Sequence, residues 1–528
     1  MQEKQREYSM KKTLSIIAAL VTLLSFGLVN TLYSKGNTLV VGGEAADRDK
    51  LPHIWWNAGA QDYYMSSLLF TDENQNPGKN DLAASREYDE NSNTYRFVLR
   101  DGVEFHDGTK LTSEDIRWNV RVCLETPRVT PITKNALKSI EGAQDFIDGK
   151  VDTISGVSTP DDKTIEFKLS TPNAFFLQGL SLLFIAPKNM LETYEKGKFH
   201  LSDFTKNPIG TGPFKIKSRV PRDYTELVAY EKYHLGKPKI ERVLMRAFGK
   251  EVTNAMRSGE LDFAFTNNMD MYTALKDDPN ITSYAKDYAY LRFMLFKQDE
   301  PWMNRDVRQA LMHAIDRPAI VESFFGDKAQ TVETNAPPGY WVNPNLEEFE
   351  YNPEKAKALL KKAGWDSSKV VSLRFYYKDE LTRDLMAAIQ NYWEQVGVKS
   401  NPRLLTGDVT GLINEKRDYD VCYMATGMFE PTDHYGRFLT DFNTGSGYKN
   451  PWYDEVHRQS QQALDPELRR LYYYELQRIM QEDRIAQPLY SPKVGVFFNK
   501  RIKLPSTMEY NYEVNHNALD IHLWELTN

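Results

Sequence analysis

The sequence predicts an α/β protein built from two or three domains. Its 528 residues exceed what one hydrophobic core usually holds, while 41% hydrophobic and 26% charged residues are ordinary for a globular chain. Short stretches with the two-residue apolar alternation of strands are followed, along most of the chain, by stretches with helical periodicity. A net charge of −7 disfavours nucleic acid as a partner, because phosphate binding requires a basic surface.

The N-terminus has the pattern of a targeting segment. An apolar run from Leu14 to Val29 follows a basic flank that contains Lys4, Arg6, Lys11 and Lys12. We therefore expect residues 1–36 to be an export signal or an uncleaved N-terminal anchor, and the rest of the chain to be periplasmic or otherwise extracytoplasmic. A lipoprotein is excluded, because the first cysteine is Cys123.

The chain has two cysteines, Cys123 and Cys422, separated by about 300 positions. We expect two separate buried thiols, and two cysteines are too few for most metal sites. No motif for a Ser or Cys nucleophile is found, so we predict neither a catalytic residue nor a metal or other cofactor.

A dense cluster of acids around His106 has a local structural interpretation. The stretch from Tyr95 to Leu99 alternates like a half-buried strand, and Asp-Gly pairs at 101–102 and 107–108 turn the chain. Thr112 is then expected to cap a helix, with its hydroxyl accepting from the amide of Asp115. His106 has no second histidine or cysteine nearby, so a structural role is favoured over that of a metal ligand.

Two further motifs lead to local expectations. In "GTGPFKI", Gly210 and Gly212 permit a tight backbone before a strand, and a phosphate-binding loop is disfavoured because Lys-Ser/Thr does not follow at the required spacing. In "DVRQALMHAIDRPAIV", His313 lies off the apolar stripe of the predicted helix, and we expect it to be solvated.

Several longer blocks resemble one protein family. These are "LRDGVEFHDG" with "LTSEDI", "GVSTPDDKTIEFKLSTPNAFF", "GTGPFKIKSRVPRDYTELVAYEKYHLGKPKIERV", "EVTNAMRSGELDFAF", "NRDVRQALMHAIDRPAIV" and "YNPEKAKALLKKAGW". In content and order they resemble the large solute-binding proteins of ABC importers, the family (family 5) that holds the oligopeptide- and dipeptide-binding proteins. The resemblance extends from Asn37 to the C-terminus.

The resemblance implies a type II periplasmic-binding-protein fold, with two α/β lobes joined by a hinge and a third, accessory α+β domain. We expect lobe I at 37–70, 183–297 and 489–528, the accessory domain at 71–182, and lobe II at 298–488. The implied function is capture of a peptide or another small oligomeric solute between the lobes and its delivery, by a monomer, to an ABC permease in the membrane. The alternatives are an oligosaccharide receptor of the same fold and a membrane-tethered ligand sensor.

The resemblance also indicates where a peptide amine would bind. Family peptide binders hold the free amine with an aspartate, in a stretch similar to "MATGMFEPT", where Glu430-Pro431 aligns and Gly427 takes the place of the aspartate. A buried ammonium without a partner costs several kcal/mol, so this change disfavours the usual peptide register unless Glu430 or Asp433 supplies the charge. We predict that Gly427, Phe429, Glu430 and Asp433 contribute to the ligand site.

Other candidate ligand contacts lie in the first half of the chain. Trp55 and Trp56 fall where family members contact ligand, and we expect one of the pair to pack in the core while the other faces the cleft. Asn267 and Asn268 follow a predicted strand and are candidates for orienting a ligand, although a plain turn is an equal alternative. Arg292 is a candidate partner for a carboxylate. Trp and Asn side chains would also suit a sugar oligomer.

Overall fold

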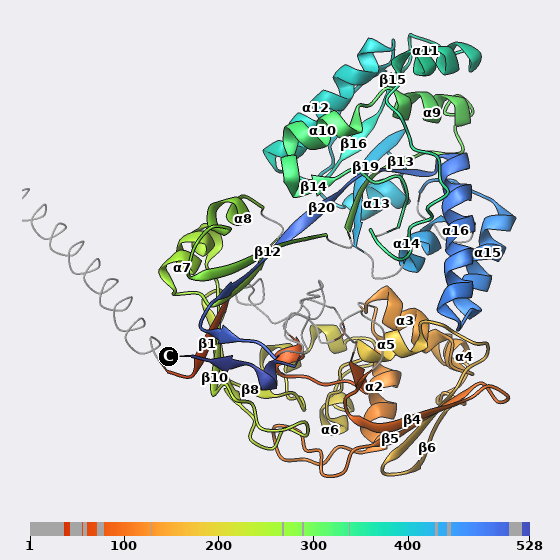
Figure 1. The fold of residues 1–528 in the computed structure, drawn as a ribbon. Coiled ribbons are helices and arrows are strands. Elements are labelled where there is room, and N and C mark those ends of the chain that lie inside the picture. The colour runs from red at the N-terminus through yellow and green to blue at the C-terminus, as the bar shows by residue number, and fades with distance from the viewer. Residues whose placement is uncertain are drawn as a thin grey trace, which may run out of the picture.

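The computed structural model describes residues 36–42, 55, 61–70, 79–127, 129–266, 269–287, 290–336, 338–427, 431–440, 445–505 and 520–527. Figure 1 shows two α/β lobes, one above the other, with a smaller sheet and its helices attached to the lower one. The predicted α/β class is confirmed.

The first lobe is built around β1 (Thr38–Gly42), which pairs in parallel with β10 (Arg242–Arg246). Leu39 and Val41 belong to one hydrophobic cluster and Val40 to another, because successive side chains of a strand point to opposite faces. Both faces of this sheet are therefore covered. Its other elements are β8 (Phe214–Val220), β9 (Tyr224–Ala229), β11 (Phe263–Thr266), β12 (Ile281–Asp287), α7 (Val252–Ser258) and α8 (Met269–Leu275).

The second lobe has the same layered design. In β13 (Tyr290–Phe296), Phe293 and Leu295 face one cluster, whereas Met294 and Phe296 face the other. The strands are completed by β14 (Ala329–Gln330), β16 (Leu373–Phe375), β18 (Arg403–Leu404) and β19 (Val421–Gly427). The helices are α9 (Arg305–His313), α10 (Arg317–Phe324), α11 (Pro353–Lys362), α12 (Glu380–Gln395), α13 (Val409–Asn414), α14 (Thr432–Tyr435), α15 (Pro451–Gln462) and α16 (Pro466–Asp483).

One long strand joins the two lobes. Strand β20 (Ala486–Asn499) pairs through its first half with β13 and through its second half with β11 and β12. Together with the chain that passes from β12 to β13, it carries the connection between the lobes (Figure 1). The two sheets consequently form one 12-stranded sheet, in the order β18-β16-β19-β13-β20-β11-β1-β10-β9-β8 with β12 and β14 paired to β20.

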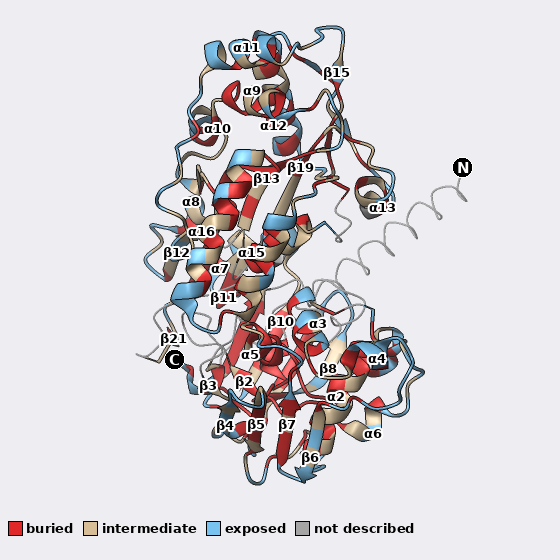
Figure 2. Ribbon diagram, turned by 90° about the vertical axis from the view of Figure 1, so that its right-hand side faces the viewer, coloured by how far each residue is buried: buried red, intermediate tan, exposed pale blue. Residues whose placement is uncertain are grey.

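The attached sheet has the order β4-β5-β7-β6, formed by β4 (Ala83–Asp89), β5 (Thr94–Leu99), β6 (Val157–Asp161) and β7 (Thr164–Lys168). Figure 2 shows that its central strands are largely buried and that β6 is an exposed edge. Its helices are α2 (Ser113–Glu125), α3 (Pro131–Lys138), α4 (Ala143–Ile147), α5 (Phe176–Ser181) and α6 (Lys188–Leu191).

The remaining elements are short. Three two-stranded pairs join β2 (Leu69–Phe70) to β3 (Lys79–Asn80), β15 (Val370–Val371) to β17 (Lys399–Ser400), and β21 (Ile502–Lys503) to β22 (Glu525–Leu526). Single 3-10 turns lie at Gln61–Tyr63, Phe199–Leu201, Asp203–Lys206, Gly249–Glu251, Gly326–Lys328, Gly436–Phe438 and Ile521–Leu523.

The predicted strand, the predicted helix start and the tight backbone at the glycine motif are confirmed. Helix α2 begins after Thr112, but the direction of the capping bond differs from the prediction: the Asp115 carboxylate accepts from the Thr112 amide at 2.8 Å and from its hydroxyl at 2.9 Å, and the Asp115 amide donates to the Thr112 carbonyl at 3.1 Å. A Cβ on Gly212 would lie 2.5 Å from the carbonyl carbon of Tyr64, so this position requires glycine. The two cysteines are free and buried, as expected.

The expectation for His313 is wrong. Its side chain is buried, its Nδ1 lies 2.9 Å from the Glu350 carbonyl, and its ring stacks on Phe349 at 4.2 Å. The reason is that a segment about 37 positions later folds over the polar side of the helix, which periodicity alone does not reveal.

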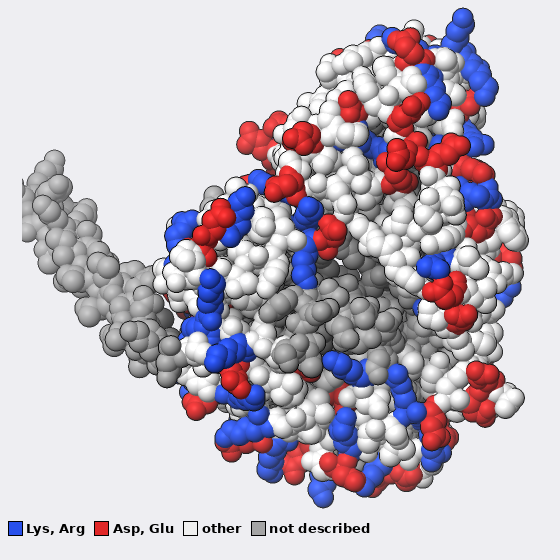
Figure 3. Space-filling view, viewed as in Figure 1, with Lys and Arg blue, Asp and Glu red and all other residues white. Residues whose placement is uncertain are grey.

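Two surface properties accompany this fold. On the face shown in Figure 3, positive and negative side chains are interspersed over both lobes. No helix in the described ranges combines the length and apolar character that crossing a bilayer requires. The predicted signal or anchor at 1–36 lies outside the described residues, except for Gly36.

Candidate functional site

A cavity of about 470 Å³ lies where the two lobes meet their connecting strands. Its wall includes Asp270 of α8 from the first lobe, Asp379 and Thr382 at the start of α12 from the second, and Tyr490 of β20. A cavity of this size, bounded by two bodies, is typical of a binding site for a small molecule.

Arg292 of β13 lies on the wall of this cavity. Its guanidinium carbon is 4.0 Å from the ring centre of Tyr377, 5.4 Å from that of Tyr290 and 5.6 Å from that of Tyr423. These distances are within the range of cation–π attraction, which is strongest where water is excluded. Aromatic rings thus hold the cation in place.

Tyr423 and Tyr490 complete the aromatic surroundings. Their hydroxyls are 2.7 Å apart, and the hydroxyl of Tyr377 donates to that of Tyr376 at 3.0 Å. Burial raises the pKa of Tyr377 and the pKa of Tyr490, so both phenols are neutral near pH 7. They are therefore hydrogen-bonding groups and not counter-charges for Arg292.

Two acids and two lysines also line the cavity. Lys328, on the second lobe, donates to Asp270 on the first at 2.6 Å. The Asp379 carboxylate caps α12 by accepting from the amide of Thr382 at 2.8 Å and from its hydroxyl at 3.0 Å. Lys493 has no ion pair within the part of the chain that the structure describes.

Among the predicted contacts that the structure describes, Arg292 lines this cavity. Trp55 is buried, its Nε1 donates to the Phe184 carbonyl at 2.9 Å, and its ring lies 5.1 Å from that of Phe199. Trp55 is thus the packed member of the tryptophan pair. Gly427 ends β19 as an exposed residue and pairs with Tyr290, at the same end of β13 as Arg292.

The other predicted contacts fall outside the described part of the chain. These are Trp56, Asn267, Asn268, Phe429 and Glu430, together with the side chain of Asp433, whose backbone belongs to α14. Their role in the ligand site stays a prediction.

The tyrosines around Arg292 were missed by the sequence analysis. Tyr290, Tyr377, Tyr423 and Tyr490 come from four separate segments that the sheet brings together. One signal was available, because the pair Tyr376-Tyr377 directly follows the strand β16, and loops after strand ends often carry binding residues.

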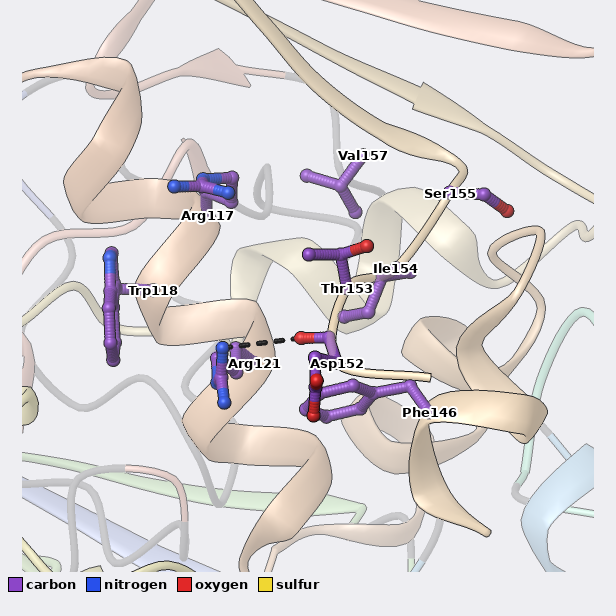
Figure 4. A pocket seen from close by; sticks show the side chains of 9 residues that line it. All are labelled: Arg117, Trp118, Arg121, Phe146, Asp152, Thr153, Ile154, Ser155 and Val157. Carbon is purple, nitrogen blue, oxygen red and sulfur yellow. Dashed lines mark hydrogen bonds between the residues drawn. The ribbon is translucent and has the colours of Figure 1, made fainter. Parts of the chain in front are cut away.

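A second cavity, of about 270 Å³, lies in the attached sheet-and-helix unit, between α2 and the segment 152–157 (Figure 4). Arg121 lies on its wall between Trp118 and Asp152, with its guanidinium carbon 5.2 Å from the centre of the Trp118 ring and 5.4 Å from that of Phe146, and it donates to the Asp152 carbonyl at 3.3 Å. Arg117 is paired with Glu114. The cations of this cavity already have partners, and none of its lining comes from the second lobe.

The acid cluster around His106 is structural. His106 Nε2 lies 3.0 Å from the Gly212 carbonyl, and burial lowers the pKa of this histidine to about 4, so the ring is neutral near pH 7. Within the described ranges, no group of His, Cys, Asp and Glu side chains has the arrangement of a metal site.

Comparison with known proteins agrees with this architecture. The sequence model for bacterial extracellular solute-binding proteins, family 5 (middle region), matches residues 79–448. A protein of Brucella ovis, named provisionally as an ABC transporter peptide-binding protein, is 30% identical over 347 residues; the match covers 64% of this chain and 63% of that protein. The oligopeptide-binding protein AppA of Bacillus subtilis is 25% identical over 494 residues, which are 87% of this chain and 86% of AppA.

Solved structures show the same fold. The substrate-binding protein CtaP of Listeria monocytogenes superposes with a TM-score of 0.76 at 22% identity, covering 94% of this chain and all of CtaP. AppA of Bacillus subtilis, solved with a nonapeptide, superposes with a TM-score of 0.75 at 21% identity, covering 93% of this chain and 99% of that one. The predicted two-lobed fold is thereby confirmed.

Proposed function

This chain belongs to family 5 of the bacterial extracellular solute-binding proteins, and from that premise we propose that it is the substrate-binding component of an ABC importer. It captures a peptide, or another small oligomeric solute, between its lobes and delivers it to a membrane permease without changing any covalent bond of the ligand. Relatives named for peptide binding support the peptide over the oligosaccharide.

The observation that carries this proposal is the cavity of about 470 Å³ shared by both lobes and by the strand that joins them. A ligand in this cavity touches α8 on one lobe and the start of α12 on the other. Such a ligand has a higher affinity for the closed form than for the open form, because opening separates the two sets of contacts.

Near the hinge, one described ion pair joins the two lobes, and it contributes little to the free energy of the closed form. The pair between Lys328 and Asp270 crosses from one lobe to the other, but the Asp270 side chain is 82% exposed. An exposed ion pair contributes about 0–1 kcal/mol, so this pair adds little to the free energy that favours the closed form.

A second contact lies away from the hinge. The Ala174 amide donates to the Gln461 carbonyl of α15 at 2.8 Å, and the ring of Phe175 lies 5.5 Å from the Arg469 guanidinium of α16. Opening of the cleft breaks these contacts. We propose that they form a latch, which we define as Ala174, Phe175, Gln461 and Arg469, and that the latch closes when ligand is bound.

The test combines scattering with thermal unfolding. Small-angle X-ray scattering of the full chain is recorded with and without a pool of tri- to pentapeptides, and the melting temperature is recorded with the same pool and with a pool of oligosaccharides. We expect a smaller radius of gyration and a raised melting temperature with peptides. Superimposable scattering curves together with unchanged melting in both pools would remove the proposal.

The proposed function also includes the domain boundaries and the export of the protein from the cytoplasm. We propose the boundaries expected from the sequence (37–70, 183–297 and 489–528 for lobe I; 298–488 for lobe II; 71–182 for the accessory domain) with two changes. Strand β13 (Tyr290–Phe296) is counted with lobe II, because it pairs with β19, and α6 (Lys188–Leu191) is counted with the accessory domain, where the Lys188 amide donates to Asp115 of α2. We take residues 1–36 as an export signal or anchor. Mass determination of the protein released from the cell envelope distinguishes cleavage of the segment from its retention. A monomeric state is tested by light scattering.

A further inference from the structure

Arg292 differs from the other interior arginines of the described chain. Its Nη1 has no contact with solvent, and its guanidinium has no hydrogen-bond acceptor among the described residues. The arginines with buried side chains each donate to at least one protein oxygen: Arg308, Arg317, Arg374, Arg469 and Arg484. A guanidinium taken out of water without an acceptor is costly, so its position on the cavity wall requires an explanation.

The tyrosines around Arg292 satisfy only part of its bonding capacity. Tyr377, at 4.0 Å, lies against the guanidinium and attracts its charge. The five N–H donors of a guanidinium lie in its plane and point outward from the edges, where a π face cannot accept them. The contact with Tyr377 therefore holds the group in place and leaves its in-plane donors without an acceptor. A carboxylate is the acceptor that matches this fork with two parallel hydrogen bonds.

The charges of the cavity wall favour an anion as well. Its charged members are Arg292, Lys328 and Lys493, against Asp270 and Asp379. Asp270 is paired with Lys328, and both oxygens of Asp379 accept from Thr382. Arg292 and Lys493 have no acidic partner in the described segments, whereas the donors to Asp379 are neutral groups. The wall carries three cations and two acids, and this net positive charge favours an anionic group of the ligand.

We propose that the cleft recognises a carboxylate of its ligand through Arg292, and that it does not require a free amine. This inference rests on the proposed function, because it assigns the chemistry by which the interlobe cavity selects its solute. The carboxylate is either the C-terminus of a peptide or an acidic side chain. Tyr377 acts as the positioning residue that presents the guanidinium edge to the ligand.

The experiment uses the full chain and four pools of tri- to pentapeptides made from Ala, Leu, Phe, Ser and Asn. One pool has both termini free, one is N-acetylated, one is C-amidated, and one is C-amidated with a single Glu in each peptide. Isothermal titration gives an apparent Kd for each pool. We expect amidation to weaken binding roughly 10- to 100-fold, the range for losing hydrogen bonds to a charged group, and acetylation to change it less than about threefold.

Substitutions then assign the effect to Arg292. Arg292→Gln should bind the free and amidated pools equally, and Arg292→Lys should retain part of the difference because it keeps the charge without the fork. Arg458→Gln, on the exposed surface of α15 and paired with Glu455, is the matched control and should behave as the unmodified chain. If Arg292→Gln does not fold, the comparison of free with amidated peptides on the unmodified chain still decides the question.

The outcomes separate the two proposals. Equal affinity for the free pool, the amidated pool and the amidated pool with Glu, or a strict need for the free amine, overturns the carboxylate site and leaves the receptor function standing. Restored affinity in the Glu pool supports the site and identifies an acidic side chain as a source of the carboxylate. No binding of any pool overturns the receptor function for peptides, and the carboxylate site with it.

Discussion

Replacing Arg317 with Met should destabilise the second lobe strongly. The side chain is 3% exposed, donates to both oxygens of Glu333 at 2.8–2.9 Å, and also bonds the carbonyls of Val332, Phe349 and Pro488 at 2.8–3.2 Å. Pro488 lies in β20, two positions before Tyr490 on the cavity wall. One side chain thus ties α10 and two loop segments to the strand that joins the lobes.

The expected loss of unfolding free energy follows from the polar groups that the substitution leaves without a partner. Two buried carbonyls and one part-buried carbonyl lose their donor, and the half-buried Glu333 carboxylate loses its counter-charge. Breaking a fully buried pair costs about 3–5 kcal/mol, so a loss of about 3 kcal/mol is expected here. For a unit of about 190 residues, each kcal/mol lowers the melting temperature by about 2–4 °C, so a decrease on the order of 10 °C is expected.

Differential scanning calorimetry and urea unfolding provide the measurement. The control is Arg458→Met, which breaks an exposed pair and should change the unfolding free energy by less than about 0.5 kcal/mol. The double variant of Arg317→Met with Glu333→Gln should be less destabilised than the sum of the single variants, because the second change removes the charge that the first left unpaired. A loss below about 1 kcal/mol for Arg317→Met, or strict additivity, would refute this reasoning.

Three further predictions concern the pH dependence of stability, the glycine at position 212 and the latch. Burial lowers the pKa of His106 to about 4, so the unfolded chain binds a proton that the folded chain does not between about pH 6.5 and 4. The contribution of His106 to the unfolding free energy should therefore be fully present above pH 6.5 and be lost, by up to about 3 kcal/mol, as the pH drops to 4. In urea titrations, His106→Gln should reduce the pH dependence of the unfolding free energy by that amount. Gly212→Ala should lower the unfolding free energy by more than about 2 kcal/mol, because the new Cβ meets the backbone of Tyr64 at 2.5 Å. The control is Gly102→Ala, where a Cβ meets nothing within 4 Å and only the positive φ costs about 1 kcal/mol. Equal melting temperatures for the two variants would contradict the packing argument. Phe175→Ser should weaken peptide affinity about threefold to tenfold and enlarge the radius of gyration measured with ligand, and an unchanged Kd would show that the latch does not favour closure.

The features predicted from the sequence are those that depend on near neighbours. The strand at Tyr95–Leu99 and the helix start after Thr112 rest on contacts within a few positions, and both are confirmed. The tight backbone at Gly212 was expected from its motif, although the segment that it contacts, at Tyr64, was not. His313 was misjudged because its partners, Phe349 and Glu350, lie about 36 positions away.

The sequence by itself determined the α/β class, the family resemblance and the choice of Arg292 as a candidate for carboxylate binding, because periodicity, turn chemistry and motif order are written locally along the chain. Only the tertiary structure decided that Arg292 stands against Tyr377, Tyr423 and Tyr290, with no acceptor in the described chain. Strands from distant parts of the chain become neighbours through sheet pairing, and no local pattern encodes which side chains then surround one another.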